Sequence, residues 1–141
     1  MNGSEASILL DAVLPEGAEA PGVARRFVAR LDPELSAELM PSVVLLVSEV
    51  VTNSYRHGAA GDDVIGLRVS LVDGGVRVEV SDAGAGPTAP ILRQGSVDGG
   101  WGLRIVDELS SRWGISAEGR RRVVWFELPT ADVGRQPVAG S

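Results

Sequence analysis

The sequence predicts an α/β (α+β) protein of the two-layer kind, in which helices cover one face of a β-sheet. Two observations lead to this prediction. Apolar residues recur at the helical period in some stretches and alternate at the strand period in others. These stretches follow one another in the order β-α-α-β-β-α-β-β, without internal repeats. A sheet with helices on one face fits that order, and each element is justified below.

The composition is that of one globular domain without a membrane span. The chain has 141 residues, of which 44% are hydrophobic, enough for a sizeable core. No apolar run approaches the roughly 18 residues that a membrane helix needs. Cysteine is absent, which excludes a disulfide framework and a thiolate metal site. The first five residues carry no positive charge, so we expect no signal peptide and a cytoplasmic location.

The basic residues exclude several kinds of chemistry. All 13 are arginine, which rules out a phosphate-binding loop of the G-x-x-x-x-G-K-[ST] type and a catalytic lysine. The net charge of −6 argues against nucleic acid as a partner, because phosphate binding favours a basic face. The single histidine excludes metal sites that are built from several histidines.

The first half of the chain predicts one strand and two helices. Residues Ile8–Leu14 read as a strand and Ala18–Leu31 as an amphipathic helix with Pro21 in its first turn, where proline is tolerated. Asp32 and Pro33 then interrupt the chain. A second helix is predicted from about Glu34 to His57, and Pro41 inside that stretch predicts a kink or a restart.

The middle of the chain predicts a β-hairpin. Residues 61–63 read as a turn and Val64–Val72 as a strand. The segment Asp73-Gly74-Gly75 is typical of a hairpin turn. Val76–Val80 alternates, with its three valines on one face and an arginine and a glutamate on the other. Residues 83–99 contain two prolines and several glycines and read as a loop.

The last third predicts a helix and a strand pair. The helix covers Gly102–Ser111 and should turn three side chains inward, namely Leu103, Val106 and Leu109. Two strands, Trp113–Ala117 and Arg122–Leu128, follow around a turn, and the triplet Arg120–Arg122 is interpreted as a solvated part of that turn. We expect the domain to cover residues 1–129 and residues 130–141 to form a disordered tail.

Three polar residues of the second helix form one line. Glu49, Asn53 and His57 are spaced four apart, and Gly58 follows where a helix would stop. A carboxylate and an amide one turn apart, beside a buried face, can accept a proton and hold a cation. Taken alone, the same pair is more commonly a solvated helix face, and both interpretations stay open at this point.

Two glycine-rich stretches suggest what these residues face. Asp82 follows a strand and precedes Gly84 and Gly86, a pattern that on its own also describes an ordinary Asp-x-Gly turn. The second stretch, residues 98–103, precedes and opens a helix. Glycines at a helix start leave its first N–H groups free to point at an anion, and the helix dipole adds to that attraction.

Together the three stretches resemble the N, G1 and G2 boxes of the GHKL ATPase superfamily, which includes gyrase, Hsp90, histidine kinases and MutL. With the continuations at 104–114 and 124–128, the chain looks most like the anti-sigma-factor serine kinases of the RsbW and SpoIIAB type, in their actinobacterial form. The resemblance covers roughly residues 8–128. It implies a Bergerat-type ATP-binding fold, with a mixed, mostly antiparallel sheet and helices on one face.

The resemblance also implies roles for single residues. Asn53 would bind Mg²⁺, Glu49 would be the general base, and Asp82 would accept a hydrogen bond from the amino group of adenine, which favours ATP over GTP. The remaining ATP-binding residues would be His57, Gly84, Gly86, Gly99, Gly100, Trp101, Gly102 and Leu103. Residues 87–99 would form a lid. Relatives often carry a threonine near the start of the last strand, where this chain has Val123 and Val124.

The function that the resemblance implies is an ATP-dependent serine kinase that regulates transcription. Its substrate would be a STAS-type anti-sigma antagonist, and its second partner would be a sequestered sigma factor. A homodimer formed through the sheet is compatible with the resemblance. The alternative is a non-catalytic regulatory module that binds ATP or only a partner. The catalytic domain of a two-component kinase fits poorly, because the chain shows no dimerisation helix with a phospho-acceptor histidine.

Overall fold

The computed structural model describes residues 7–15, 17–32, 34–55, 64–83, 100–119 and 121–129, and it leaves the side chains of residues 100–103 and 118 undescribed. Five strands are β1 (Ser7–Leu14), β2 (Ile65–Val72), β3 (Gly75–Asp82), β4 (Arg112–Glu118) and β5 (Arg121–Pro129). The helical elements are a short 3-10 turn, η1 (Gly17–Glu19), and the helices α1 (Ala20–Ala29), α2 (Met40–Asn53) and α3 (Gly100–Leu109).

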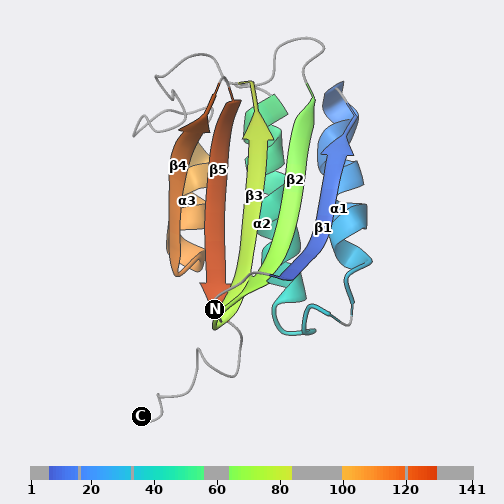
Figure 1. Cartoon of the computed structure of the whole chain (residues 1–141), viewed down its shortest axis with the longest axis vertical. Coiled ribbons are helices and arrows are strands. Elements are labelled where there is room, and N and C mark those ends of the chain that lie inside the picture. The colour runs from blue at the N-terminus through green and yellow to red at the C-terminus, as the bar shows by residue number, and fades with distance from the viewer. Residues whose placement is uncertain are drawn as a thin grey trace.

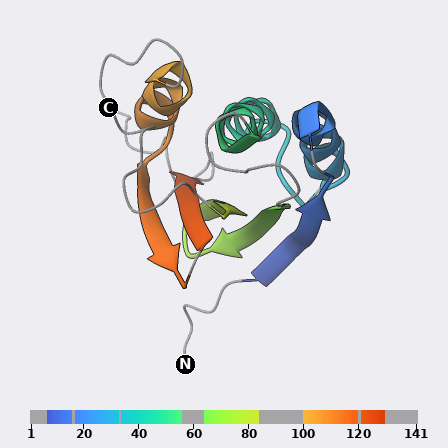
Figure 2. The same ribbon diagram turned by 90° about the horizontal axis from the view of Figure 1, so that it is seen from above.

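The strands form one sheet, and the three α-helices lie side by side on one of its faces (Figures 1 and 2). The strand order is β1-β2-β3-β5-β4, so β5 lies between β3 and β4. The predicted two-layer sandwich is therefore confirmed. All four strand pairings are antiparallel, so the described sheet is not mixed.

The core lies between the sheet and the helices. The alternate residues of β3 and β5 that face the helices are buried, as the strand period requires: Val76, Val78, Val80, Val124, Phe126 and Leu128. The helices contribute a complementary set of buried side chains: Ala20, Ala24, Val28, Val43, Leu46, Val47, Val50 and Val51. The valines of β3 thus face inward, as their alternation predicts.

The second predicted helix is shorter than expected. Residues 34–39 form turns, and α2 begins at Met40, with Pro41 in its first turn. Proline lacks an N–H group and fits the first turn, where that group has no intrahelical partner. Pro41 therefore starts the helix rather than kinking it. The turns before it still contribute Leu35 and Leu39 to the core.

The third predicted helix is displaced by two residues, and one of its residues was predicted to face inward but is exposed. It begins at Gly100 and ends at Leu109. Val106 is fully buried as expected, but Leu109 is 44% exposed, so its predicted inward position is wrong. Three residues rotate a helix by about 300°, so Leu109 does not point in the same direction as Val106, and α3 lies at one end of the helix layer (Figure 2).

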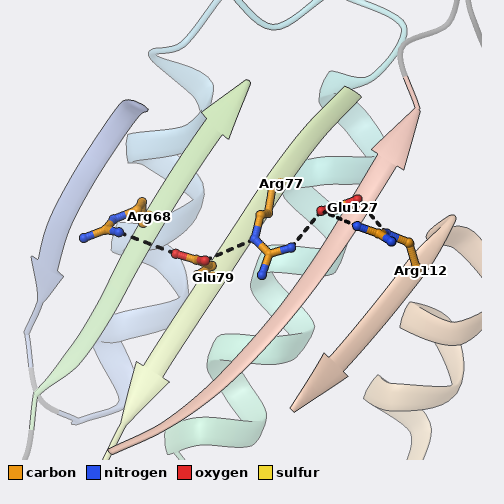
Figure 3. Close-up of polar contacts among 5 residues, drawn as sticks. All are labelled: Arg68, Arg77, Glu79, Arg112 and Glu127. Carbon is orange, nitrogen blue, oxygen red and sulfur yellow. Dashed lines mark hydrogen bonds and ion pairs between the residues drawn. The ribbon is translucent and has the colours of Figure 1, made fainter. Parts of the chain in front are cut away.

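The face of the sheet away from the helices carries a row of paired charges (Figure 3). Arg77 lies between Glu79 and Glu127, at 3.1 and 2.7 Å, and Arg112 reaches Glu127 at 2.9 Å. The Arg77 guanidinium also lies over the ring of Trp125, 4.2 Å from its centroid. No described helix is long and apolar enough to cross a membrane.

Candidate functional site

One end of the sheet gathers the start of β2, the end of β3 and the start of β5. The register shows this directly, because Gly66 pairs with Ser81 and Asp82 pairs with Arg122. The backbone N–H of Ser111 donates to the carbonyl oxygen of Glu127 at 2.8 Å, which fixes the C-terminal end of α3 at the opposite end of β5. Helix α3 therefore begins at the end of the sheet where Asp82 lies (Figure 1, top).

Helix α2 also ends at this end of the sheet, near the end of β3 (Figure 1). Asn53 is its last residue and is only 6% exposed, while Glu49, one turn earlier, is half-buried. The chain continues into a wider π-type turn at Ser54 and Tyr55, a deviation that is frequent at functional sites. Within the described part of the chain, the side chains of Glu49 and Asn53 make no hydrogen bond, so no described residue occupies their polar atoms.

Asp82 is a buried carboxylate at the end of a strand. It continues the inward alternation of β3 and has no exposed surface. Arg122, its direct partner on β5, is 6% exposed and donates from Nη2 to Asp82 Oδ2 at 3.1 Å. The two side chains therefore form an ion pair on the core face, at the same end of the sheet as the C-terminus of α2.

Most of the hydrogen-bonding capacity of this pair is unused. Asp82 Oδ1 and the Nε and Nη1 atoms of Arg122 are buried and have no partner among the described residues. A guanidinium carries five N–H donors and a carboxylate two acceptor oxygens, and leaving such groups buried and unpaired is costly. The pair can therefore accept one N–H group and donate to neighbouring acceptors of a ligand.

The interpretation of the arginine triplet as a solvated turn is wrong for two of its members. Strand β5 begins at Arg121, so the strand period points Arg121 to the open face and Arg122 to the core. Arg121 Nη2 donates to the backbone carbonyl oxygens of Val64 and Ser81, each at 3.0 Å, and joins the residue before β2 to β3. Extending the alternation of β5 backward from Phe126 and Val124 would have identified Arg122 as inward.

Several predicted site residues lie outside the described residues. These are His57, Gly84, Gly86 and Gly99, together with the expected lid at 87–99, the turn at 61–63 and the tail at 130–141. Gly100, Trp101, Gly102 and Leu103 form the first turn of α3, which agrees with a helix start at that place. Their side chains are not described.

The donor set fits a magnesium–nucleotide complex better than a metal site made by protein alone. Among the described residues, no group of three or more His, Cys, Asp or Glu side chains could hold an ion. Mg²⁺ in nucleotide sites commonly takes only one or two ligands from the protein and the rest from phosphates and water. The Asn53 amide oxygen is of the right chemical type for that single ligand.

Comparisons with known proteins identify the family. Residues 14–128 match the histidine kinase-like ATPase domain. Two curated relatives, both called anti-sigma F factor and both from Clostridium botulinum, are 42% and 40% identical over 62 residues. That match spans 43% of this chain and 42% of each relative, so the chain aligns with less than half of their length.

Solved structures share the fold. The RsbU and RsbW domains of a Mycobacterium tuberculosis protein superpose with a TM-score of 0.63 at 22% identity, over 89% of this chain and 32% of that one. The histidine kinase domain of a blue-light activated kinase from Erythrobacter litoralis gives 0.56 at 22% identity, over 81% and 65%. Because the family match covers most of the chain, this protein belongs to the histidine kinase-like ATPase domain family.

Proposed function

We propose that this chain is an ATP-binding anti-sigma regulatory factor, a serine protein kinase that phosphorylates a STAS-type antagonist and sequesters a sigma factor. The observation that carries the proposal is the buried Asp82 carboxylate, whose Oδ1 has no partner, at the edge where α2 ends and α3 begins. The family supports nucleotide binding, and the names of the curated relatives support the anti-sigma role.

The nucleotide would be held at both of its ends. Asp82 Oδ1 would accept a hydrogen bond from the amino group of adenine, and Gly84 and Gly86 would let the backbone approach the base. The phosphates would lie against the start of α3, from Gly100 onward, where free N–H groups and the helix dipole favour negative charge. This chain has no lysine to assist, so backbone groups, Mg²⁺ and arginine would share that task.

The end of α2 would supply the chemistry. Glu49 would accept the proton of the seryl hydroxyl as the seryl oxygen bonds to the γ-phosphorus of ATP and the bond from that phosphorus to the departing ADP oxygen breaks. Asn53 would orient Mg²⁺, which neutralises phosphate charge when it is bound. The spacing of one helical turn puts both side chains on one face of α2. His57 would support the helix end.

Isothermal titration tests the nucleotide site. Wild-type protein should bind ATP in a Mg²⁺-dependent way, and Asp82→Asn should remove that binding. No binding by the wild type at millimolar ATP would contradict the proposal.

Phosphoryl transfer to a STAS-domain antagonist tests the catalytic role. Glu49→Ala should abolish transfer and keep ATP binding, whereas Glu108→Ala, an exposed glutamate of α3, should leave both unchanged. Transfer by Glu49→Ala at the wild-type rate would show that Glu49 is not the general base.

One observation favours a second candidate, a regulatory module that binds a nucleotide or a partner without catalysis. Arg122 Nη2 donates to Asp82 Oδ2, so that oxygen is bonded within the protein and only Oδ1 is left for a nucleotide. This module would bind ATP without transfer to any STAS partner. A homodimer formed through the open face of the sheet is compatible with either function, and sedimentation of the free protein would detect it.

A further inference from the structure

Arg122 is a buried arginine that uses little of its hydrogen-bonding capacity within the described part of the chain. Its guanidinium makes one hydrogen bond, to Asp82 Oδ2, while Nε and Nη1 are buried without a partner. Asp82 Oδ1, on the other side of the same ion pair, is equally unpaired. Both side chains are more than nine-tenths buried. The pair therefore presents an unused acceptor and unused donors within one ion pair.

The cost of this arrangement suggests that a ligand completes it. Removing two charges from water is repaid only when their remaining hydrogen-bonding groups are also satisfied. Apolar residues of similar volume often replace such a pair without loss of stability. The sheet itself therefore gives no reason to keep an incompletely bonded arginine at the start of β5.

The edge of adenine supplies the missing partners. Its amino group is a donor, and ring nitrogens, which are acceptors, flank that group; N7 and the amino group are the pair that proteins read in DNA. A donor beside an acceptor on the base matches an acceptor beside a donor on the protein. The planar guanidinium fork allows one N–H group to stay on Asp82 while another reaches the base.

We infer that Arg122 is a second base-recognising residue, which donates from Nε or Nη1 to a ring nitrogen next to the adenine amino group while Asp82 accepts from that amino group. This inference rests on the proposed nucleotide site. It assigns to the start of β5 a direct charged contact with the base.

The test removes one ring nitrogen from the ligand and the guanidinium group from the protein, separately and together. Titrations with ATP, 7-deaza-ATP and 1-deaza-ATP would be run on wild type and on Arg122→Met. Wild type should bind one of the two analogues about 10-fold more weakly than ATP, the loss expected for one hydrogen bond from a charged donor. Arg122→Met should bind ATP more weakly and should no longer distinguish ATP from that analogue.

A neighbouring arginine provides the matched control. Arg121 is bonded to backbone carbonyls of the residue before β2 and of β3 on the other face of the sheet. Arg121→Met should therefore keep the wild-type penalty for the analogue. If Arg122→Met fails to fold, Arg122→Lys replaces it in the cycle, because an ammonium keeps the charge beside Asp82 but lacks the planar fork. The penalty in Arg122→Lys should fall below about 3-fold, which is less than the loss expected for one hydrogen bond from a charged donor.

The outcomes separate this inference from the proposed function. If wild type binds ATP through Asp82 but shows no penalty for either analogue, Arg122 does not contact the base and the nucleotide site stands. An equal penalty in wild type and in the Arg122 variant overturns the inference in the same way. If wild type binds no ATP at all, the inference and the proposed function both fail.

Discussion

Both faces of β3 and β5 carry arginines and carboxylates, but the two sets differ in how completely they are hydrogen-bonded. On the open face, Glu127 accepts from both Arg77 and Arg112, and Arg77 also bonds Glu79 (Figure 3). On the core face, Asp82 and Arg122 share a single hydrogen bond, and within the described part of the chain three of their polar atoms are buried without a partner. The strands thus hold a well-bonded row on one side and an incomplete pair on the other.

This difference in burial and hydrogen bonding suggests different roles for the two sets of charges. Partly exposed pairs stay solvated, so each contributes little and costs little. A buried pair carries a large desolvation penalty that one hydrogen bond does not offset. The open-face row therefore has the properties of a solvated surface, whereas the core-face pair keeps the unpaired groups that the proposed ligand would satisfy. Four substitutions on the two faces test this difference.

The largest expected effect is that of Arg122→Met. It leaves the Asp82 carboxylate buried without its counter-charge, which should reduce the free energy of unfolding by about 3–5 kcal/mol. Urea denaturation monitored by circular dichroism measures the change. A loss under about 1 kcal/mol, the range of exposed pairs, would contradict the account, because the pair would then behave like an exposed one.

Glu127→Gln should have a smaller, pH-dependent effect. Partial burial raises the pKa of Glu127, but its hydrogen bonds and charge interactions with Arg112 and Arg77 outweigh burial, so the pKa lies below its ordinary value of 4.5. A carboxylate with a depressed pKa stabilises the fold above that value and loses its contribution as the pH falls through the folded pKa.

At pH 7, Glu127→Gln should therefore lose about 1–2 kcal/mol of stability. The difference from wild type should shrink as the pH falls below 4.5. Urea midpoints measured from pH 7 to pH 3 check this. A deficit that is constant over that range would mean that lost packing, and not the ionised carboxylate, causes the change.

Gly114→Ala tests the packing under the open-face row. An added Cβ would lie 2.9 Å from Cζ2 of Trp125, so the indole that stacks with Arg77 must shift. We expect a loss of about 1 kcal/mol, the low end for overpacking because the ring is only half-buried. Ser116→Ala, exposed on the same strand, is the control and should have no effect in the same thermal-unfolding assay.

The smallest effect should come from Arg68→Met. Arg68 lies 3.3 Å from Asp11 and 3.8 Å from Glu79, and its side chain is 47% exposed. Exposed pairs of this kind typically contribute about 0.2–1 kcal/mol, and salt screens them. A change above about 1 kcal/mol in the urea midpoint assay would show that the row acts as a cooperative network.

Local patterns predicted the parts of the fold that depend on neighbouring residues. The alternation of Val76, Val78 and Val80 predicts their inward direction, and one further step of the same period leads to Asp82. The glycines before residue 103 predict a helix start, and α3 begins at Gly100. The proline at 41 predicts a kink or a restart, and α2 begins at Met40 with that proline in its first turn.

What the sequence did not predict depends on contacts between distant residues. Arg122 lies 40 positions from Asp82, and the two meet only because β5 inserts between β3 and β4. Charged residues are rarely buried, so three arginines after a glycine were interpreted as a solvated turn. The exposure of Leu109 likewise depends on where the helix layer ends, which periodicity alone does not specify.

The central claim is that the Asp82–Arg122 pair is kept for a ligand and not for the fold. The measurement that tests it most directly is the stability and ATP affinity of the double variant Asp82→Leu/Arg122→Met. The account predicts an unfolding free energy equal to or above that of wild type, with ATP binding lost. A double variant that stays several kcal/mol less stable, as expected for a structural pair, or that still binds ATP like wild type, would contradict the account.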